Sequence, residues 1–227
     1  MIYITGDTHR TDLLYIHIFC DNHPELTKND YIIIAGDFGG VWAKDTLERD
    51  LKPFSDLPVT VLFVDGNHEN FDLLNAYPVE MWKGGKVHKI KPDIIHLMRG
   101  QVFEIEGKTI FTFGGAASID RDWRIEGESW RAQELPTYEE LDEGIANLKC
   151  YGNKVDYIIT HSCSERAFAY PIIRNNATIK YNCPEVQMLS YIEDIVQFKH
   201  WYFGHFHIDA KLSDKYTALL HNVVRIE

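Results

Sequence analysis

The chain has 227 residues, of which 45% are hydrophobic, and this suits one α/β domain with a sizeable core. The composition excludes a largely disordered protein, and no apolar run approaches the ~18 residues expected of a membrane helix. The formal net charge is −11, from 34 acidic and 23 basic residues. A surface of this sign disfavours long nucleic acids, whose binding rests on clustered Lys and Arg. A small phosphorylated substrate stays compatible, because metal ions can supply local positive charge.

The start of the chain and its cysteines indicate where the protein works. The opening Met-Ile-Tyr-Ile-Thr-Gly-Asp lacks the basic and long apolar segments of a signal peptide. The cysteines form no C-x-x-C pair, so neither a zinc ribbon nor a thioredoxin-like motif is supported. A disulfide framework is not needed in a chain of this length. We therefore expect a cytoplasmic protein without a membrane partner. A strand starting almost at Met1 leaves no room for an upstream domain, so we expect one domain over residues 1–227.

Five apolar runs end in Gly, Asp, Asn or His, a pattern typical of buried strands bounded by turns. They span residues 2–4, 31–35, 59–64, 155–159 and 201–203. Between the third and fourth runs we expect a hairpin, with strands 101–105 and 109–113 and a turn near Glu106-Gly107. In open α/β sheets, the carboxyl ends of the strands carry the chemistry. The pattern therefore predicts an α/β fold whose functional residues follow the strands.

Two helical patterns and one long loop complete the predicted elements. Thr137 and Glu140 form a T-x-x-E capping box before an apolar stripe, which predicts a helix start. Pro184 suits the first turn of a second helix with its own apolar stripe. Both helices are expected to pack on the sheet without carrying function. Residues 114–136 show no clear periodicity and predict a long surface loop, and long loops are often functional.

Five short blocks at the predicted strand ends hold side chains that can ligate metals. They are Asp7-Thr8-His9, Gly36-Asp37, Gly66-Asn67-His68-Glu69, Thr160-His161 and Gly204-His205-Phe206-His207. Taken singly, an Asp after a strand is more often a turn or helix cap than a ligand. The whole set at matching strand ends indicates a metal centre. Imidazoles with carboxylate and amide oxygens, and without thiolate, suit Mn²⁺, Fe, Zn²⁺, Co²⁺ or Ni²⁺.

In this order the blocks D-x-H, G-D, G-N-H-[ED], a later His and G-H-x-H resemble those of the calcineurin-like metallophosphoesterases. The resemblance covers nearly the whole chain, from Asp7 to His207. It implies a four-layer α/β/β/α sandwich, in which two facing sheets are flanked by helices and the metals lie at the strand ends. It also implies hydrolysis of a phosphate ester with two divalent metal ions, which we expect to be Mn²⁺. A metal-bridging hydroxide would attack phosphorus in line.

The resemblance also assigns roles to individual residues. The ligands of the first metal would be Asp7, His9 and His207, and those of the second Asn67, His161 and His205. Asp37 would bridge both metals. His68 would ligate neither, and would face the phosphate to protonate the leaving oxygen or stabilise its charge. Two divalent ions carry four positive charges, of which the two aspartates offset two, and the remainder suits a phosphate dianion.

The sequence departs from the protein Ser/Thr phosphatases of this family, which carry G-D-x-x-D-R-G. In that motif the second Asp orients the catalytic His and the Arg grips phosphate. Gly40 and Val41 occupy these two positions here. The departure disfavours a phosphoprotein substrate and leaves open what orients His68, with Glu69 as one candidate.

Other arginines could bind the substrate instead of the missing one. Arg10 directly follows the first block, and Arg121, Arg124 and Arg131 lie in the long loop with Trp123 and Trp130. Such a loop could grip phosphate and stack a base, or be a solvated loop packed by its own aromatics. We expect Cys163, close to His161, to be a small buried residue rather than a nucleophile.

These observations favour an enzyme acting on a nucleotide or another small phosphorylated substrate. A phosphoprotein phosphatase is one alternative. A non-catalytic scaffold with the same fold is the other, but such family members typically lose metal ligands or the catalytic histidine. Both kinds of residue are present here, which favours the enzyme. The sequence does not distinguish monoester, diester and anhydride substrates, and it leaves the oligomeric state open.

Overall fold

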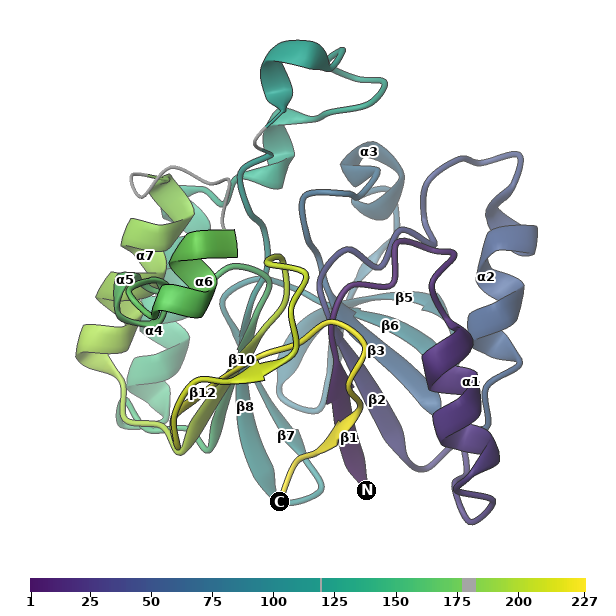
Figure 1. The fold of residues 1–227 in the computed structure, drawn as a ribbon, viewed down its shortest axis with the longest axis horizontal. Coiled ribbons are helices and arrows are strands. Elements are labelled where there is room, and N and C mark those ends of the chain that lie inside the picture. The colour runs from purple at the N-terminus through teal and green to yellow at the C-terminus, as the bar shows by residue number, and fades with distance from the viewer. Residues whose placement is uncertain (119, 177–182) are drawn as a thin grey trace.

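The computed structural model describes residues 1–118, 120–176 and 183–227, with the side chains of residues 121 and 176 left out. Two β-sheets face each other, and helices lie on the outer side of each (Figure 1). The strand ends that carry the sequence blocks lie at one edge of this arrangement, and both termini lie at the opposite edge (Figure 1).

The first sheet has seven strands in the order β13-β1-β2-β3-β6-β5-β4. Their bounds are β1 Ile2–Thr5, β2 Tyr31–Ala35, β3 Thr60–Val64, β4 Val79–Trp82, β5 Gly85–Lys91, β6 Ile94–Leu97 and β13 Val224–Arg225. The central strands β1, β2, β3 and β6 are parallel, and the outer pairings are antiparallel. Parallel strands end at the same edge of the sheet, so the loops that follow β1, β2 and β3 are neighbours.

The second sheet has six strands in the order β11-β12-β10-β9-β8-β7. Their bounds are β7 Gln101–Ile105, β8 Lys108–Phe113, β9 Tyr157–Thr160, β10 His200–Phe203, β11 Ala210–Lys211 and β12 Tyr216–Ala218. Strands β8, β9, β10 and β12 are parallel. The predicted hairpin is confirmed as β7 and β8, and Glu106 and Gly107 at its turn both have positive φ, as a tight hairpin turn requires.

Helices cover the outer face of each sheet. Figure 1 shows α1 (Leu14–Asp21) and α2 (Leu47–Ser55) beside the seven-stranded sheet. Beside the six-stranded sheet lie α4 (Tyr138–Cys150), α5 (Glu165–Phe168), α6 (Pro171–Asn176) and α7 (Pro184–Ile195). A short helix, α3 (Phe71–Leu74), follows the loop after β3. The capping box at Thr137 and Glu140 begins α4, and Pro184 begins α7, as predicted.

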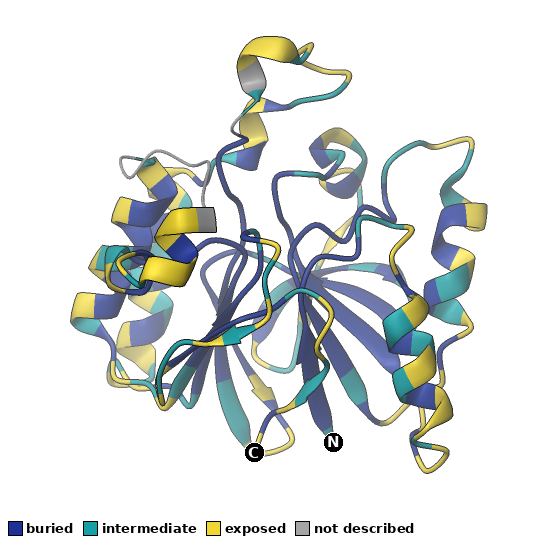
Figure 2. Ribbon diagram, viewed as in Figure 1, coloured by how far each residue is buried: buried dark blue, intermediate teal, exposed yellow. Residues whose placement is uncertain are grey.

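The alternation of side chains in the strands explains the four layers. Ile32 and Ile34 of β2 pack with the helix-covered face, whereas Ile33 and Ala35 pack between the two sheets. Successive side chains of a strand point to opposite faces, so a strand buried on both faces is a continuous apolar run. Figure 2 shows the central strands of both sheets buried. The expected α/β/β/α sandwich is therefore confirmed.

The long loop between β8 and α4 has more regular structure than the sequence predicts. It contains two short 3₁₀ turns, η1 (Arg121–Trp123) and η2 (Ala132–Glu134). This segment stands above the edge at which the strands end (Figure 1). Within the described residues, no helix is long and apolar enough to cross a membrane.

Candidate metal centre

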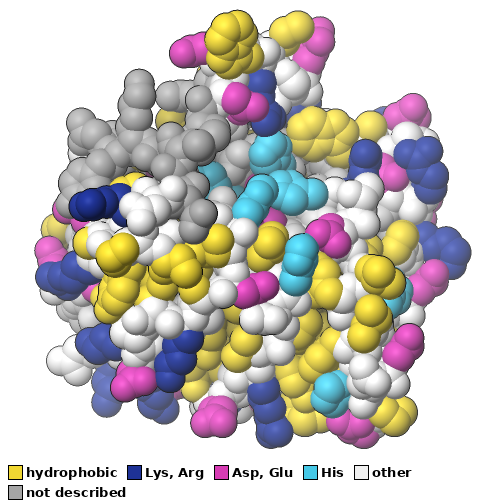
Figure 3. Space-filling view, viewed as in Figure 1, with side chains coloured by type: hydrophobic (Ala, Val, Ile, Leu, Met, Phe, Trp, Pro, Cys, Tyr) yellow, Lys and Arg dark blue, Asp and Glu magenta, His cyan; other side chains and the backbone are white. Residues whose placement is uncertain are grey.

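The two sheets bring the predicted blocks together at one edge. Asp7, Asp37 and Asn67 follow β1, β2 and β3, whereas His161 and His205 follow β9 and β10 of the other sheet. Histidine side chains gather on the surface below the segment that rises from this edge (Figure 3). The site is thus assembled from loops far apart in the sequence.

An unusual backbone conformation recurs in these loops. Positive φ angles occur at four residues within the blocks, namely His9 (43°), Asp37 (49°), His205 (69°) and His207 (50°). Arg10, which directly follows the first block, also has a positive φ, 67°. Residues other than Gly and Asn rarely adopt this conformation, which costs about 1–3 kcal/mol each and is concentrated at functional sites. Here it turns the chain sharply at the strand ends.

Two glycines allow the loops to approach one another. Gly36 has a φ of 96°, and a Cβ at this position would overlap the ring of His161. A Cβ at Gly66 would overlap the carboxylate of Asp37. The glycines of the G-D and G-N-H blocks are therefore required by close packing of the loops.

His161 lies fully buried at the centre of the site. Its Nδ1 is 2.8 Å from the carbonyl oxygen of Ala35, so this nitrogen carries the proton and donates it. Its Nε2 faces two oxygens, 3.2 Å from Oδ1 of Asn67 and 3.3 Å from Oδ1 of Asp37. The lone pairs of this nitrogen and the two oxygens thus point at one another. A cation bound between the three atoms would stabilise this arrangement.

Asp7 and Asp37 place two buried carboxylates in the same site. The backbone N–H of His205 donates to Asp7 at 3.0 Å, and that of His68 donates to Asp37 at 2.8 Å. Among the described residues, only histidines form ion pairs with these two carboxylates. Buried charges are normally paired or bound to metal, so this carboxylate pair also fits a cation.

The remaining histidines complete the cluster. Nε2 of His9 lies 3.1 Å from Nε2 of His207 and 3.7 Å from Oδ2 of Asp37. The ring of His205 lies 4.8 Å from that of His161. Nε2 of His205 is buried without a hydrogen-bond partner in the part of the chain that the structure describes. A buried polar atom without a partner is costly, and metal coordination would satisfy it.

The pKa values in the cluster show how strongly its charges interact. Burial, together with the charge of Asp37, raises the pKa of Asp7 to about 7 although His161 opposes the shift. Burial would also raise the pKa of Asp37, but His161 outweighs it and holds this pKa well below its usual range. Burial disfavours the charged form of His161, yet the Asp37 carboxylate raises its pKa to about 10. A positive charge is thus favoured at this point in the site.

In the part of the chain that the structure describes, two groups of side chains have the spacing of a metal site, and both include Asp37. One comprises His9, Asp37 and His68, and the other Asp7, Asp37 and His161, with the ligand atoms of each group within 4.8 Å of one another. The donors are imidazoles and carboxylates, which suit divalent transition metals. The first group includes His68, which the sequence places outside the metal ligands.

His68 contacts the long loop through Arg124. Nη1 of Arg124 lies 3.4 Å from Nδ1 of His68 and donates to the backbone oxygen of Ser129, while its Nε pairs with Asp120 at 2.7 Å. Burial lowers the pKa of His68, and the nearby guanidinium lowers it further against the effect of Asp37. Arg124 is therefore the group that the structure places against the His68 ring.

Glu69 has a different position from the one considered in the sequence analysis. Its buried carboxylate accepts hydrogen bonds from the backbone N–H groups of Phe38, at 2.7 Å, and Gly39, at 3.2 Å. In return, Asp37 accepts from the backbone of His68. The loops after β2 and β3 thus hold each other by two reciprocal carboxylate contacts, and Glu69 supports the Asp37 loop rather than His68.

The family model for calcineurin-like phosphoesterases matches residues 1–209. The chain belongs to this family.

No curated protein matches the chain. Among solved structures, it is similar to a Staphylococcus aureus protein provisionally named a 5′-nucleotidase, solved with α-ketoglutarate, at 15% sequence identity and a TM-score of 0.49. The match covers 96% of this chain and 48% of that protein. A likeness at this level says nothing about the substrate of this phosphoesterase.

The three arginines predicted to bind substrate have different positions in the phosphoesterase. Arg10 lines a cleft with His9 and His68 and pairs with Asp50 at 3.2 Å. Arg124 contacts the His68 ring. Arg121 begins η1, and its side chain lies outside the described part of the structure.

Three other residues considered in the sequence analysis neither line this cleft nor belong to the cluster of ligand candidates. Arg131 is buried and pairs with Asp72 at 3.0 Å. Trp123 is 91% exposed. Cys163 is buried in the core beside the six-stranded sheet, and burial raises the pKa of its thiol, which confirms that it is a small core residue.

Sequence reasoning missed residues whose importance depends on contacts between segments. Ser118 accepts a hydrogen bond from Nδ2 of Asn67 at 3.1 Å and donates one to Glu134 at 2.7 Å, which turns Oδ1 of Asn67 toward His161. Trp42 lines the same cleft as His68. Neither residue belongs to a recognisable block, so no sequence signal distinguishes it.

Proposed function

We propose that this phosphoesterase binds two divalent ions and hydrolyses a small phosphorylated substrate such as a nucleotide. The observation that carries the proposal is the position of Asp37, which both groups of potential ligands share. The ligands of one ion would be Asp7, His9, Asp37 and His207, and those of the other Asp37, Asn67, His161 and His205. When bound, the two ions would lower the pKa of a water molecule and neutralise the phosphate oxygens.

The protein's own side chains would orient the substrate and assist the leaving group. Arg10 lines the cleft that contains His68, and Arg124 contacts the His68 ring. Guanidinium groups bind phosphate oxygens well. His68 lies beside His9, with ring centres 5.1 Å apart. From there it would donate a hydrogen bond to the leaving oxygen.

The size of the cleft supports a small substrate. The cleft measures about 160 Å³ and is lined by His9, Arg10, Gly39, Trp42 and His68. Sites for drug-sized ligands are usually about 300–1,000 Å³, so this cleft would hold the phosphate and only part of the group attached to it. The net charge of −11 also disfavours a polyanionic substrate.

Metal reconstitution tests this function. The protein would be stripped with a chelator, reloaded with Mn²⁺, and assayed on p-nitrophenyl phosphate, bis-p-nitrophenyl phosphate and a panel of nucleotides. We expect two ions per chain by metal analysis and hydrolysis that depends on them. Asn67→Ala and His161→Ala should each lose the second ion, whereas the control His23→Ala, on the first sheet's helical side, should keep both. One ion per chain in the reloaded protein, or two in both site variants, would contradict the proposal.

A further inference from the structure

Trp42 forms an aromatic wall of the cleft that contains His68. It lies in the loop between β2 and α2, and it shares the lining of the cleft with His9, Arg10, Gly39 and His68. The other lining side chains are basic or imidazole groups, or have no side-chain surface. Trp42 is therefore the part of the cleft that can cover an apolar portion of a substrate.

Contacts on two sides hold Trp42 in place. Its backbone oxygen accepts a hydrogen bond from Nδ2 of Asn70 at 2.6 Å, at the start of α3. The guanidinium of Arg131 lies 5.8 Å from the centre of its ring. Arg131 is itself fixed, because it pairs with Asp72 at 3.0 Å and donates to the backbone oxygen of Gly127 at 3.1 Å.

A side chain held in this way loses little freedom when a ligand packs on it. Tryptophan has only two rotatable side-chain bonds, and rigid aromatic groups give contact area at a low entropic cost. The cation–π contact with Arg131 restricts the ring further. The cleft therefore has a phosphate-binding end of imidazole and guanidinium groups beside a preformed flat apolar surface.

We propose that Trp42 determines substrate specificity, by stacking against a flat ring in the alcohol portion of the phosphate ester. The proposal rests on the proposed function, since it places the phosphate beside His68. Stacking on an aromatic face is tolerant of the aromatic ring's identity, so the site would select nucleoside monophosphates as a class over sugar phosphates that lack an aromatic ring. It would not distinguish strongly between bases.

Trp123 is the natural alternative and the matched control. It lies in η1 of the long loop and is 91% exposed, so it makes few contacts that would orient its ring. Trp42 lines the cleft itself. A tryptophan replacement at each position separates stacking in the cleft from a general effect of losing an aromatic residue.

The test compares adenosine 5′-monophosphate with ribose 5-phosphate, which differ only in the base. We expect the wild-type protein to prefer the nucleotide by about 10-fold in kcat/KM, since stacking of one base contributes roughly 1–3 kcal/mol. Trp42→Leu and Trp42→Met should lose most of this preference, because their kcat/KM should decrease more for the nucleotide than for ribose 5-phosphate. Trp42→Phe should keep much of it, and Trp123→Leu should leave it unchanged.

The outcomes distinguish this inference from the proposed function. If the metal-loaded wild type hydrolyses neither these compounds nor p-nitrophenyl phosphate, the proposed function fails. If it hydrolyses both, and the aliphatic Trp42 variants keep the preference or lose both activities equally, the specificity role is wrong. Should both aliphatic variants fail to fold, the wild-type kinetics decide. Equal kcat/KM values for the nucleotide and ribose 5-phosphate overturn the inference.

Discussion

At the scale of single residues, the neighbours of His68 determine what this side chain can do. A guanidinium N–H can only donate, so the contact of Arg124 with Nδ1 of His68 makes that nitrogen an acceptor. The proton of the neutral ring then lies on Nε2. A neutral imidazole with this tautomer donates a hydrogen bond to a leaving oxygen and so stabilises its developing charge.

His68→Ala should therefore keep its metals and lose turnover. We expect a decrease in kcat of about 10²–10³-fold, the usual range when one hydrogen-bond donor to a developing charge is removed. The decrease should be larger for alkyl phosphates and nucleotides than for p-nitrophenyl phosphate, because p-nitrophenolate needs little stabilisation. Steady-state kinetics and metal analysis of the same preparations measure both effects.

Two results would contradict this division of roles. Full activity on an alkyl phosphate would show that His68 does not assist the leaving group. Loss of one ion would show that His68 is a ligand, as its place within 4.8 Å of His9 and Asp37 allows. Arg124→Met is an informative companion, since it removes the Nδ1 contact and leaves the imidazole in place.

Individual site residues could be predicted where their identity reflects local chemistry. Every metal-ligand candidate named from the sequence lies in the cluster, because each follows a strand and parallel strands end together. The position of Glu69 could not be predicted, since its partners, the N–H groups of Phe38 and Gly39, are about thirty residues away. Ser118 and Trp42 were missed for the same reason.

At the scale of secondary-structure elements, the loops after the strands are tightly constrained. Glu69 holds the loop after β2 from one side by a hydrogen bond to its backbone. On the other side, the ring of His161 occupies the space that a Cβ on Gly36 would need. Loop conformation and metal-site geometry are therefore coupled. A change that alters this loop should affect the metals as well as the stability.

Gly36→Ala tests this coupling. The new Cβ would overlap the His161 ring and would also strain a backbone with a φ of 96°. We expect loss of at least one ion and a marked decrease in the unfolding temperature. Gly152→Ala is the matched control, because Gly152 also has a positive φ, 64°, but has open space where the Cβ would lie. That variant should lose about 1 kcal/mol of stability and keep its metals. Equal effects in the two variants would show that backbone strain alone is responsible.

The elements that could be predicted are those with strong periodic or capping signals. Strands β2 and β3, buried on both faces, and the capped helix α4 fall close to the predicted ranges. Helix α2 contains Pro53 near its C-terminal end, and a proline beyond the first turn removes an intrahelical hydrogen bond, so the sequence argues against a helix there. The two-residue strand β13 depends on pairing with β1 at the other end of the chain, and β11, although it pairs with the nearby β12, is too short to show a periodic signal.

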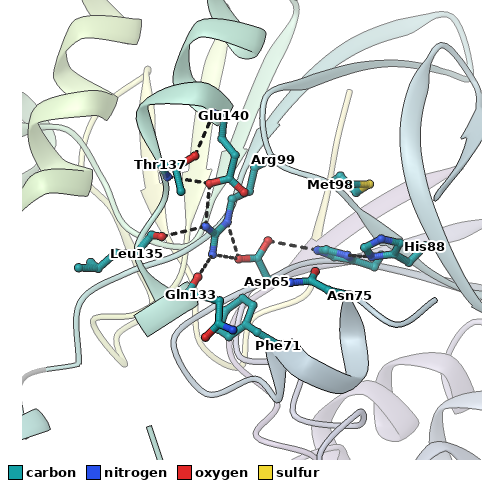
Figure 4. A pocket seen from close by; sticks show the side chains of 11 residues that line it. Asp65, Phe71, Asn75, His88, Met98, Arg99, Gln133, Leu135, Thr137 and Glu140 are labelled. Carbon is teal, nitrogen blue, oxygen red and sulfur yellow. Dashed lines mark hydrogen bonds and ion pairs between the residues drawn. The ribbon is translucent and has the colours of Figure 1, made fainter. Parts of the chain in front are cut away.

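At the scale of the whole molecule, one buried arginine joins the two halves of the sandwich behind the site. Arg99 lies between β6 and β7, and its guanidinium pairs with Asp65 at the end of β3 and with Glu140 of α4 (Figure 4). It also donates to backbone oxygens of the long loop at Gln133 and Leu135. Asp65 accepts a further hydrogen bond from the buried ring of His96. The network therefore connects both sheets to the loop that carries Asn67, a proposed metal ligand.

A double-mutant cycle measures how much this connection stabilises the fold. Arg99→Leu leaves the Asp65 carboxylate buried without its main counter-charge, and removal of one partner of a buried pair typically costs about 3–5 kcal/mol. Asp65→Asn removes the charge that the arginine opposes. Because the two side chains interact directly, the double variant should lose less stability than the sum of the single changes, by roughly 0.5–3 kcal/mol. Chemical denaturation of metal-free protein at neutral pH gives all three free energies of unfolding.

The exposed pair of Lys52 and Asp56 provides the comparison for this cycle. Both of its side chains are more than half exposed, at 71% and 53%, and their nitrogen and oxygen lie 2.8 Å apart. An exposed ion pair contributes only about 0–1 kcal/mol, so Lys52→Leu should change stability little. If Arg99→Leu were equally mild, or if the Arg99 and Asp65 changes were additive, the network would not be the link between the sheets. A large coupling energy between Arg99 and Asp65 would instead mean that the ion pair joining the two sheets also anchors the loop that carries Asn67. The stability of the fold and the geometry of the proposed metal site would then depend on one buried contact.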